Sequence, residues 1–222
     1  MFRRRSHASD EQIDAEGGQP GEAVDTSRPP VGDPTGPWDV AQLDGQGDAQ
    51  RIDFGALLIP ALDGMQLRVE LGEDQQVVAI TVLLGETSLQ LQAFAAPRGE
   101  GIWDDVRQEI AEGIRGSQGM AREADGPFGR ELRAEVPLEG MTGSASRQVV
   151  RFIGADGPRW FLRGLISGAG GADPTEAGPV EEIFRGVAVR RGDHAAAPRE
   201  PLPLTVPNDS GLLSEEPPAD GG

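Results

Sequence analysis

Alternation of apolar and polar residues predicts a run of β-strands directly after residue 50. Residues 65–71 alternate strictly, which is the period of a half-buried strand. Residues 76–84 are nearly all apolar and rich in β-branched side chains, as in a central strand covered on both faces. Residues 89–94 alternate again, and the short apolar run 56–59 precedes them all. Short turns join these segments, so they predict consecutive antiparallel strands.

The rest of the chain predicts two helices and a second group of strands. Trp103, Val106, Ile110 and Ile114 recur at helical spacing. The further expected elements are a strand at 131–136, a hairpin of 147–153 and 159–166 around a turn at 155–158, a short helix at 175–185 and an edge strand at 187–189. This order predicts an α+β domain, a twisted antiparallel sheet of about six to seven strands with two helices packed on one face.

Composition divides the chain into a core and two tails. Leu, Ile, Val and Phe are about twice as frequent in residues 51–191 as in the flanks, and the flanks carry most of the net charge of −17. We therefore expect a disordered acidic Pro/Gly-rich tail at 1–36, a single domain at 37–191 with its core from residue 51, and a disordered acidic Pro-rich tail at 192–222. Trp38 is an isolated aromatic at the edge of the first tail. It predicts an anchor that attaches this segment to the core or to a partner.

The residue types that are missing restrict the chemistry. The chain has no Cys and no Tyr, all 20 basic residues are Arg, and its two histidines, His7 and His194, lie in the expected tails. These absences exclude a thiol nucleophile, a phosphate-binding lysine and Schiff-base chemistry, and they leave the core without a histidine for a catalytic triad or a metal site. An enzyme would have to work with carboxylates and arginines alone. We expect a protein that is not an enzyme and that holds no cofactor and no metal.

No segment predicts export or membrane insertion. Arg3, Arg4 and Arg5 are followed by polar and acidic residues, without the apolar stretch of a signal peptide. No apolar run approaches the roughly 20 residues that a membrane helix needs. The expected location is the cytoplasm, with no membrane partner.

Arginines on the predicted hairpin form the main candidate binding site. Arg147 and Arg151 are four residues apart on one strand, and Arg159 and Arg163 are four apart on the other, so each pair shares a face. Pairing of the strands would gather these guanidiniums, with Trp160 on the opposite face and Arg98 as a further contributor. Such a cluster can hold a carboxylate or a phosphate. The alternative is a solvated strand face whose arginines pair with nearby acids.

Two other features indicate structure rather than chemistry. The glycine-rich stretch 168–173 precedes a helix but lacks the spacing of a dinucleotide-binding loop. Asp104, Asp105, Glu109 and Glu112 give one helix an acidic, solvated face.

The stretch DGPRWFLRG at residues 156–164 resembles the signature of an uncharacterised actinobacterial protein family, a domain of unknown function. Similar stretches are GPWD at 36–39, LQLQAFAAPR at 89–98 and GPFG at 126–129. Together they span the core and the Trp38 segment, but the resemblance implies no activity. The strand order is also similar to that of small accessory domains of the photosystem-subunit and Ran-binding type, which implies binding or assembly roles by analogy.

The expected function is therefore binding. The first hypothesis is an adaptor whose arginine hairpin holds an acidic protein partner. The alternative is a nucleic-acid accessory factor that uses the same arginines for phosphate contacts, a role that the negative net charge disfavours.

Overall fold

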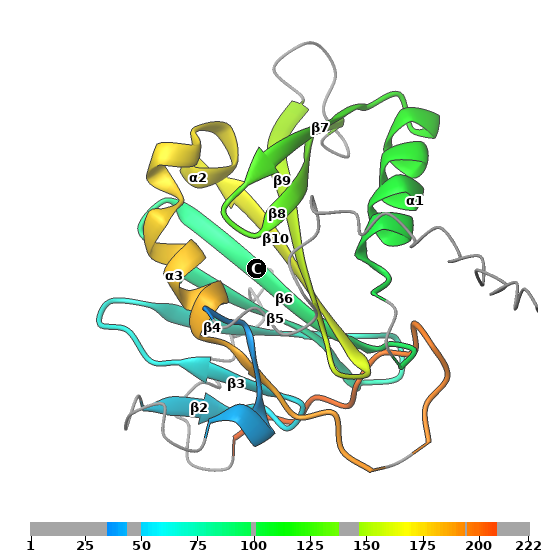
Figure 1. The fold of residues 1–222 in the computed structure, drawn as a ribbon. Coiled ribbons are helices and arrows are strands. Elements are labelled where there is room, and N and C mark those ends of the chain that lie inside the picture. Colours follow the sequence, from blue (N-terminus) through cyan, green and yellow to red (C-terminus); the bar gives the residue numbers. More distant parts are fainter. Residues whose placement is uncertain (1–34, 44–49, 99–100, 138–146, 194, 208–222) are drawn as a thin grey trace, which may run out of the picture.

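A seven-stranded antiparallel sheet forms the centre of the molecule (Figure 1). The computed structural model describes residues 35–43, 50–98, 101–137, 147–193 and 195–207. The strands, in their order across the sheet, are β4 (Gln66–Leu71), β5 (Val77–Leu84), β6 (Thr87–Ala95), β10 (Trp160–Gly168), β9 (Arg147–Gly157), β8 (Gly129–Pro137) and β7 (Met120–Gly126). Strand β6 shows why the sequence alternates, because every second side chain from Thr87 to Ala95 is buried against the core.

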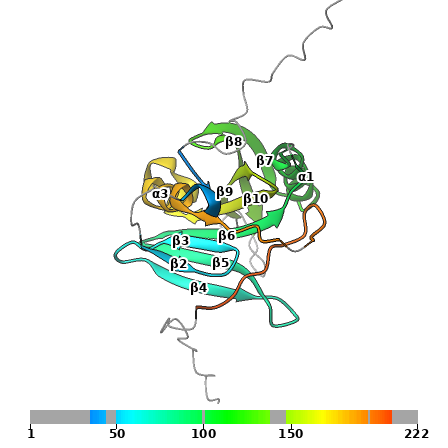
Figure 2. The ribbon, with the colours of Figure 1, turned by 60° about the horizontal axis from the view of Figure 1, so that its bottom comes forward.

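A smaller sheet packs against one face of the large one. Its strands, in order, are β1 (Trp38–Asp39), β11 (Ala188–Val189), β3 (Leu57–Pro60) and β2 (Arg51–Asp53). Leu57 and Ile59 of β3 are fully buried in the same apolar cluster as Leu89 and Leu91 of β6. Figure 2 shows the two sheets lying against each other, with α3 (Gly178–Gly186) beside them. We call the apolar cluster between the two sheets, which contains Leu57, Ile59, Leu89 and Leu91, the main core.

The two longer helices pack on opposite faces of the large sheet. Trp103 opens α1 (Trp103–Gly116) and lies against Gly154, where a Cβ would meet its ring. Phe184 of α3 lies against Gly164 in the same way. Gly154 and Gly164 belong to adjacent residue pairs of the β9–β10 ladder, and adjacent pairs face opposite sides of the sheet. The two helices therefore cover different faces (Figure 1). The architecture is α+β, but the expectation of two helices on one face is wrong.

The helices and strands expected from the sequence correspond to elements of the structure, which also contains elements that were not expected. Helix α2 (Ala169–Ala172) and the 3-10 turns η1 (Val40–Gln42) and η3 (Pro174–Glu176) are short. Strand β7 is an addition to the expected elements, because all seven of its residues are polar, small or exposed. Among the described residues, no helix is long and apolar enough to cross a membrane.

The segment 195–207 is not a tail but a strap across the sheet. Its Leu202 and Leu204 belong to the main core. Leu202 donates its backbone N–H to Ala93 of β6, and Leu204 bridges both Gly55 and Val77, the first residue of β5. The core therefore extends beyond residue 191, and the expected boundary there is wrong. Residues 1–34, nearly all of the first expected tail, and residues 208–222, about half of the second, lie outside the described residues.

Candidate functional site

The predicted cluster of hairpin arginines does not form. The β9–β10 turn consists of Pro158 and Arg159, and Arg159 has a positive φ of 62°. In the resulting register Arg151 is opposite Ile166 and Arg163 is opposite Gly154. These two arginines consequently point to opposite faces, because adjacent pairs in a ladder alternate between faces. The expectation that pairing of the two strands gathers up to four of these guanidiniums is therefore wrong.

The other predicted residues are distributed over the molecule. Arg98 follows β6 at one end of the sheet, Arg147 opens β9 at the opposite end, and both are exposed. Trp160 is fully buried in the main core, so it is not displayed for a partner.

The Trp38 segment is attached to the core. Trp38 is half-buried, and its backbone N–H donates to the Val187 carbonyl at 2.9 Å. The indole Nε1 of Trp160 donates to Asp39 Oδ2 at 2.8 Å. Asp39 also begins η1, where its side chain accepts from the Ala41 N–H.

A different set of arginines lines up across three strands. Arg122 of β7 is the register partner of Arg133 of β8, and Arg133 is the partner of Arg151 of β9. Register partners share a face, so the three guanidinium groups project from the same side of the sheet. We call Arg122, Arg133 and Arg151 the arginine row. Local periodicity does not reveal the arginine row, because β7 has no recognisable strand pattern and Arg133 occupies a polar position of an ordinary alternating strand.

The inner end of the arginine row is neutralised. Glu131 is 1% exposed and accepts from Arg133 Nε at 2.7 Å and from Arg151 Nη2 at 2.6 Å. Arg151 Nη2 also donates to Glu181 of α3 at 2.8 Å. Burial works to lower the pKa of Arg151, but the hydrogen bonds and charges of Glu131 and Glu181 outweigh it and raise that pKa. Arg151 Nη1 is buried and has no hydrogen-bond partner among the residues that the structure describes.

The outer end of the row is not neutralised. Arg122 is exposed and makes no ion pair with the other described residues, and Arg133 has only Glu131. Two like charges in directly opposed positions of a sheet repel each other. An anion that contacts both guanidiniums would relieve that repulsion.

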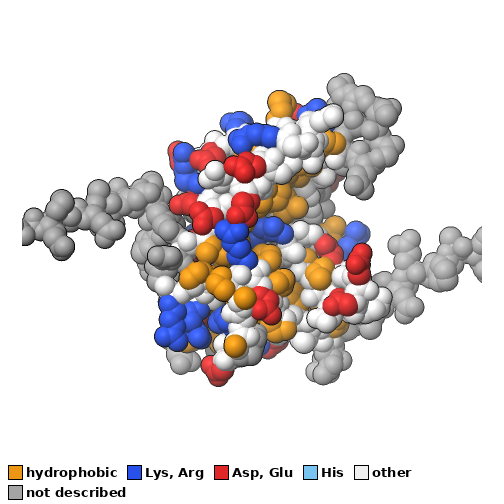
Figure 3. Space-filling view, turned by 90° about the vertical axis from the view of Figure 1, so that its right-hand side faces the viewer, with side chains coloured by type: hydrophobic (Ala, Val, Ile, Leu, Met, Phe, Trp, Pro, Cys, Tyr) orange, Lys and Arg blue, Asp and Glu red, His pale blue; other side chains and the backbone are white. Residues whose placement is uncertain are grey.

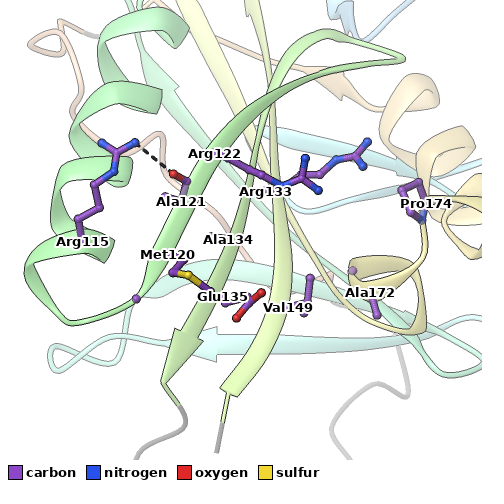
Figure 4. A pocket seen from close by; sticks show the side chains of 12 residues that line it. Arg115, Met120, Ala121, Arg122, Arg133, Ala134, Glu135, Val149, Ala172 and Pro174 are labelled. Carbon is purple, nitrogen blue, oxygen red and sulfur yellow. Dashed lines mark hydrogen bonds between the residues drawn. The ribbon is translucent and has the colours of Figure 1, made fainter. Parts of the chain in front are cut away.

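These two guanidiniums border a groove of about 480 Å³ between β7–β9 and the α2–η3 segment. Its apolar part comes from Met120, Val149, Ala172 and Pro174, of which Met120 and Val149 are exposed. Figure 4 shows Arg122 and Arg133 extending side by side toward Pro174. Across β7, Arg115 of α1 donates to the Ala121 carbonyl at 3.1 Å. We call this the arginine groove.

The ionisable side chains of the arginine groove are three arginines and one carboxylate. The arginines are Arg115, Arg122 and Arg133, and the carboxylate is Glu135. A guanidinium does not exchange its proton near neutral pH, and a single carboxylate has no second group with which to share acid–base work. The groove is suited to holding an anion.

The acidic side of α1 is a network of ion pairs. Arg107 is buried and pairs with Asp104 at 2.7 Å and with Glu123 at 3.0 Å. Arg199 of the strap reaches Glu109 at 2.6 Å. Figure 3, which views this side, shows acidic and arginine side chains next to each other. The carboxylates of α1 therefore have structural partners.

The remaining candidates give no metal site among the residues that the structure describes. No group of three or more His, Asp or Glu side chains there is arranged to hold a metal ion. Both histidines lie outside those residues. Asp173, in the glycine-rich stretch, accepts from the Thr175 N–H at 2.9 Å and so begins η3, as a connector would.

The comparisons with known proteins support the resemblance at the level of the family. No curated protein and no solved structure matches the chain. A family model described as "Protein of unknown function (DUF3710)" matches residues 36–211, which include the Trp38 segment, the arginine groove and the strap. The chain belongs to the DUF3710 family of proteins of unknown function.

Proposed function

We propose that this protein is a non-enzymatic binding protein that holds an acidic segment of a partner protein in the arginine groove. The observation that carries the proposal is the in-register placement of Arg122 and Arg133, of which only Arg133 is paired with a carboxylate, Glu131, among the described residues. The arginine cluster expected on the β9–β10 hairpin is thereby replaced by one on β7 and β8.

The hydrogen bonds of Arg133 support an anion-binding role. Its Nε is held by Glu131, and Glu131 is fixed in turn by Arg151. A guanidinium that is fixed through one nitrogen loses less conformational entropy when its other nitrogens bind a carboxylate. Arg122, with no ion pair among the described residues, supplies the second cation.

The apolar side of the groove indicates what accompanies the carboxylates. Met120 and Val149 are among the large hydrophobic residues that the structure leaves exposed, and both line the groove. Methionine adapts its shape to different apolar side chains. A segment that alternates leucine-like and acidic side chains would satisfy both parts of the groove.

The test is direct binding of a labelled peptide to the full chain. The probe is a peptide of repeated Leu-Glu-Glu units, followed by fluorescence anisotropy, with a Leu-Gln-Gln peptide as its neutral counterpart. We expect the acidic peptide to bind and the neutral one to bind at least tenfold more weakly. Arg122→Glu should weaken binding of the acidic peptide at least tenfold. Arg68→Glu, at an exposed position of β4, is the matched control and should bind as the wild type does.

Two results would overturn the proposal. One is equal affinity of the wild type and Arg122→Glu for the acidic peptide. The other is preferential binding of a single-stranded oligonucleotide, with the logarithm of affinity falling by about 0.7 per phosphate contact for each unit of log salt concentration. The latter would favour the nucleic-acid role instead.

A further inference from the structure

Strand β4 forms one edge of the large sheet, and β7 forms the other. Among the described residues, β4 pairs with β5 alone, so the backbone N–H and C=O groups along its outer edge have no strand partner there. Figure 2 shows β4 on the side of the molecule away from β7, which borders the arginine groove. An edge of this kind can extend its sheet by pairing with a strand of another chain.

Two opposite charges on β4 have no ionic partner. Arg68 and Glu70 lie two residues apart on the same face of the strand, and neither forms an ion pair with another described residue. Arg68 is exposed, and its register partner on β5 is the neutral Thr81. Glu70 is half-buried and accepts from the Thr81 hydroxyl and from Gln90 Nε2, the latter at 2.7 Å. These neutral donors fix the carboxylate without cancelling its charge.

The two charges flank Val69 and make the strand complementary to itself. When two copies of β4 pair in antiparallel orientation about a two-fold axis at Val69, Arg68 of each copy lies opposite Glu70 of the other. An axis at Arg68 or at Glu70 would instead place like charges opposite each other. Opposed unlike charges stabilise a pair of strands, whereas like charges destabilise it. The charges therefore select one register, and its contacts are reciprocal, as a two-fold interface requires.

The apolar residues of β4 agree with this register. Leu71 is 54% exposed, one of the large hydrophobic side chains that the structure leaves open to solvent. In the pairing about Val69 it lies opposite Leu67 of the second copy, and the two copies of Val69 lie opposite each other. A second copy would therefore cover part of the exposed Leu71 side chain.

An irregularity in the β4–β5 ladder leaves the outer edge of β4 regular. Glu70 pairs with Ala79 and Leu71 with Val77, so the extra residue, Val78, belongs to β5. A bulge or a proline on the edge strand itself is a common protection against edge pairing, and β4 contains neither. Because β4 is short, the interface is small, and we expect a weak association that depends on concentration.

We propose that this protein forms a two-fold symmetric dimer in which β4 of one copy pairs with β4 of a second copy. The two large sheets then continue into each other, and an Arg68–Glu70 ion pair forms on each side of the axis. The dimer uses the edge opposite to the arginine groove and does not depend on the proposed function. Arg68→Glu should consequently weaken the dimer and leave binding of the acidic peptide unchanged.

The first test is sedimentation velocity of the full chain over a series of concentrations. We expect the wild type to pass from monomer to dimer as its concentration rises. Arg68→Glu and Glu70→Arg should each raise the dissociation constant of the dimer at least tenfold, because each variant sets like charges opposite each other. Arg122→Glu, at the other edge of the sheet, is the matched control and should dimerise as the wild type does.

A mixture of the two charge variants separates pairing from loss of folding. In a dimer of one Arg68→Glu copy and one Glu70→Arg copy, every opposed pair again joins unlike charges. The mixture should therefore dimerise more strongly than either variant alone. If the wild type stays monomeric at every concentration, β4 does not pair with itself and the proposal is wrong. A dimer that neither charge variant weakens uses another surface and would overturn it as well.

A second measurement needs no change of charge. The chain has no Cys, so Val69→Cys introduces a single thiol at the proposed axis. Directly opposed residues have Cβ atoms about 4.5–5.5 Å apart, which a disulfide can bridge after a small adjustment of the strands. Under mild oxidation we expect covalent dimers from Val69→Cys in clear excess over those from Met120→Cys, which is 57% exposed at the other edge. Any result without that excess would contradict the proposal.

Discussion

Arg133 of β8 lies directly opposite Arg151 of β9, and both guanidinium groups bind the carboxylate of Glu131. One of the three, Arg133, is partly exposed at the arginine groove, whereas the other two are buried. The same carboxylate thus fixes a residue of the core and a residue of the candidate site. A change at Arg151 therefore reports on the stability of the core, whereas a change at Arg133 reports on the candidate site.

Replacing Arg151 should destabilise the fold strongly. Arg151→Met leaves Glu131 and Glu181 without their shared buried cation, for which the usual cost is about 3–5 kcal/mol. Urea unfolding measures the change in the free energy of unfolding. The double variant Arg151→Met/Glu131→Leu should recover at least half of the loss, because the buried pair is then replaced by apolar side chains. Additive losses in the double variant would contradict this account.

Replacing Asp39 should loosen the Trp38 segment. Asp39→Ala removes the acceptor of the buried Trp160 indole N–H and the side-chain cap of η1. A buried donor left without a partner costs about 1–3 kcal/mol. Guanidinium unfolding checks this, with Asp63→Ala in an exposed turn as the control. Equal stability of the two variants would show that the Asp39 contact contributes nothing.

The strap should contribute to the stability of the core. Leu202 is 2% exposed, so Leu202→Ala should lower the free energy of unfolding by roughly 2–5 kcal/mol. Leu62→Ala, at a position that is 44% exposed, should change it by less than about 0.5 kcal/mol. Urea unfolding of both variants makes the comparison. A small effect of Leu202→Ala would mean that residues 195–207 detach without loss.

The Asp53–Arg190 pair should make stability depend on pH in the acid range. The Arg190 hydrogen bonds lower the pKa of Asp53 below its ordinary value of 3.8, against the opposing effect of burial and with help from the Gly55 N–H. Because the folded pKa is the lower one, the stabilisation is present above about pH 4 and is lost as pH falls through the folded pKa. Asp53→Asn should give a flatter stability curve between pH 5 and about pH 2.

Urea unfolding at a series of pH values measures the effect of Asp53→Asn. Both partners are about half exposed, so the difference from the wild type should be small and should shrink in high salt. A wild-type curve that parallels the variant at low salt would refute the assignment.

Much of the fold could be predicted from periodicity. Strands β4, β5 and β6 alternate or are apolar throughout, and Trp103 begins the expected helix. Strand β7 could not be predicted in this way, because it is an edge strand whose side chains are mostly exposed. Its place in the sheet is decided by pairing with β8, which a local pattern does not reveal.

The arginine site could not be predicted because it depends on register. The sequence predicts the hairpin turn at residues 155–158, whereas in the structure β9 continues to Gly157. A shift of one or two residues in the turn changes which residues of the two strands are paired. It can also move a side chain to the other side of the sheet. The burial of Arg151 depends on Glu131 and Glu181, which come from two other elements of the fold. No local signal marks such partners.

The strap could not be predicted for a different reason. Averaged over residues 192–222, the composition is acidic and proline-rich, and this average hides the alternation of Leu202 and Leu204 with prolines. Two buried leucines are enough to attach a short segment when its backbone also pairs with β6.

The position of the strap has a consequence for the order in which the protein can fold during synthesis. Strands β5 and β6 pair only from Ile80 and Leu91 toward their connecting turn, and the strap occupies the space beside the far end of β6. A nascent chain that has not yet been synthesised past residue 204 therefore has an open β6 edge with unpaired backbone groups. Open edges of this kind pair with other chains, so this stage of translation is where we expect the protein to need a chaperone most.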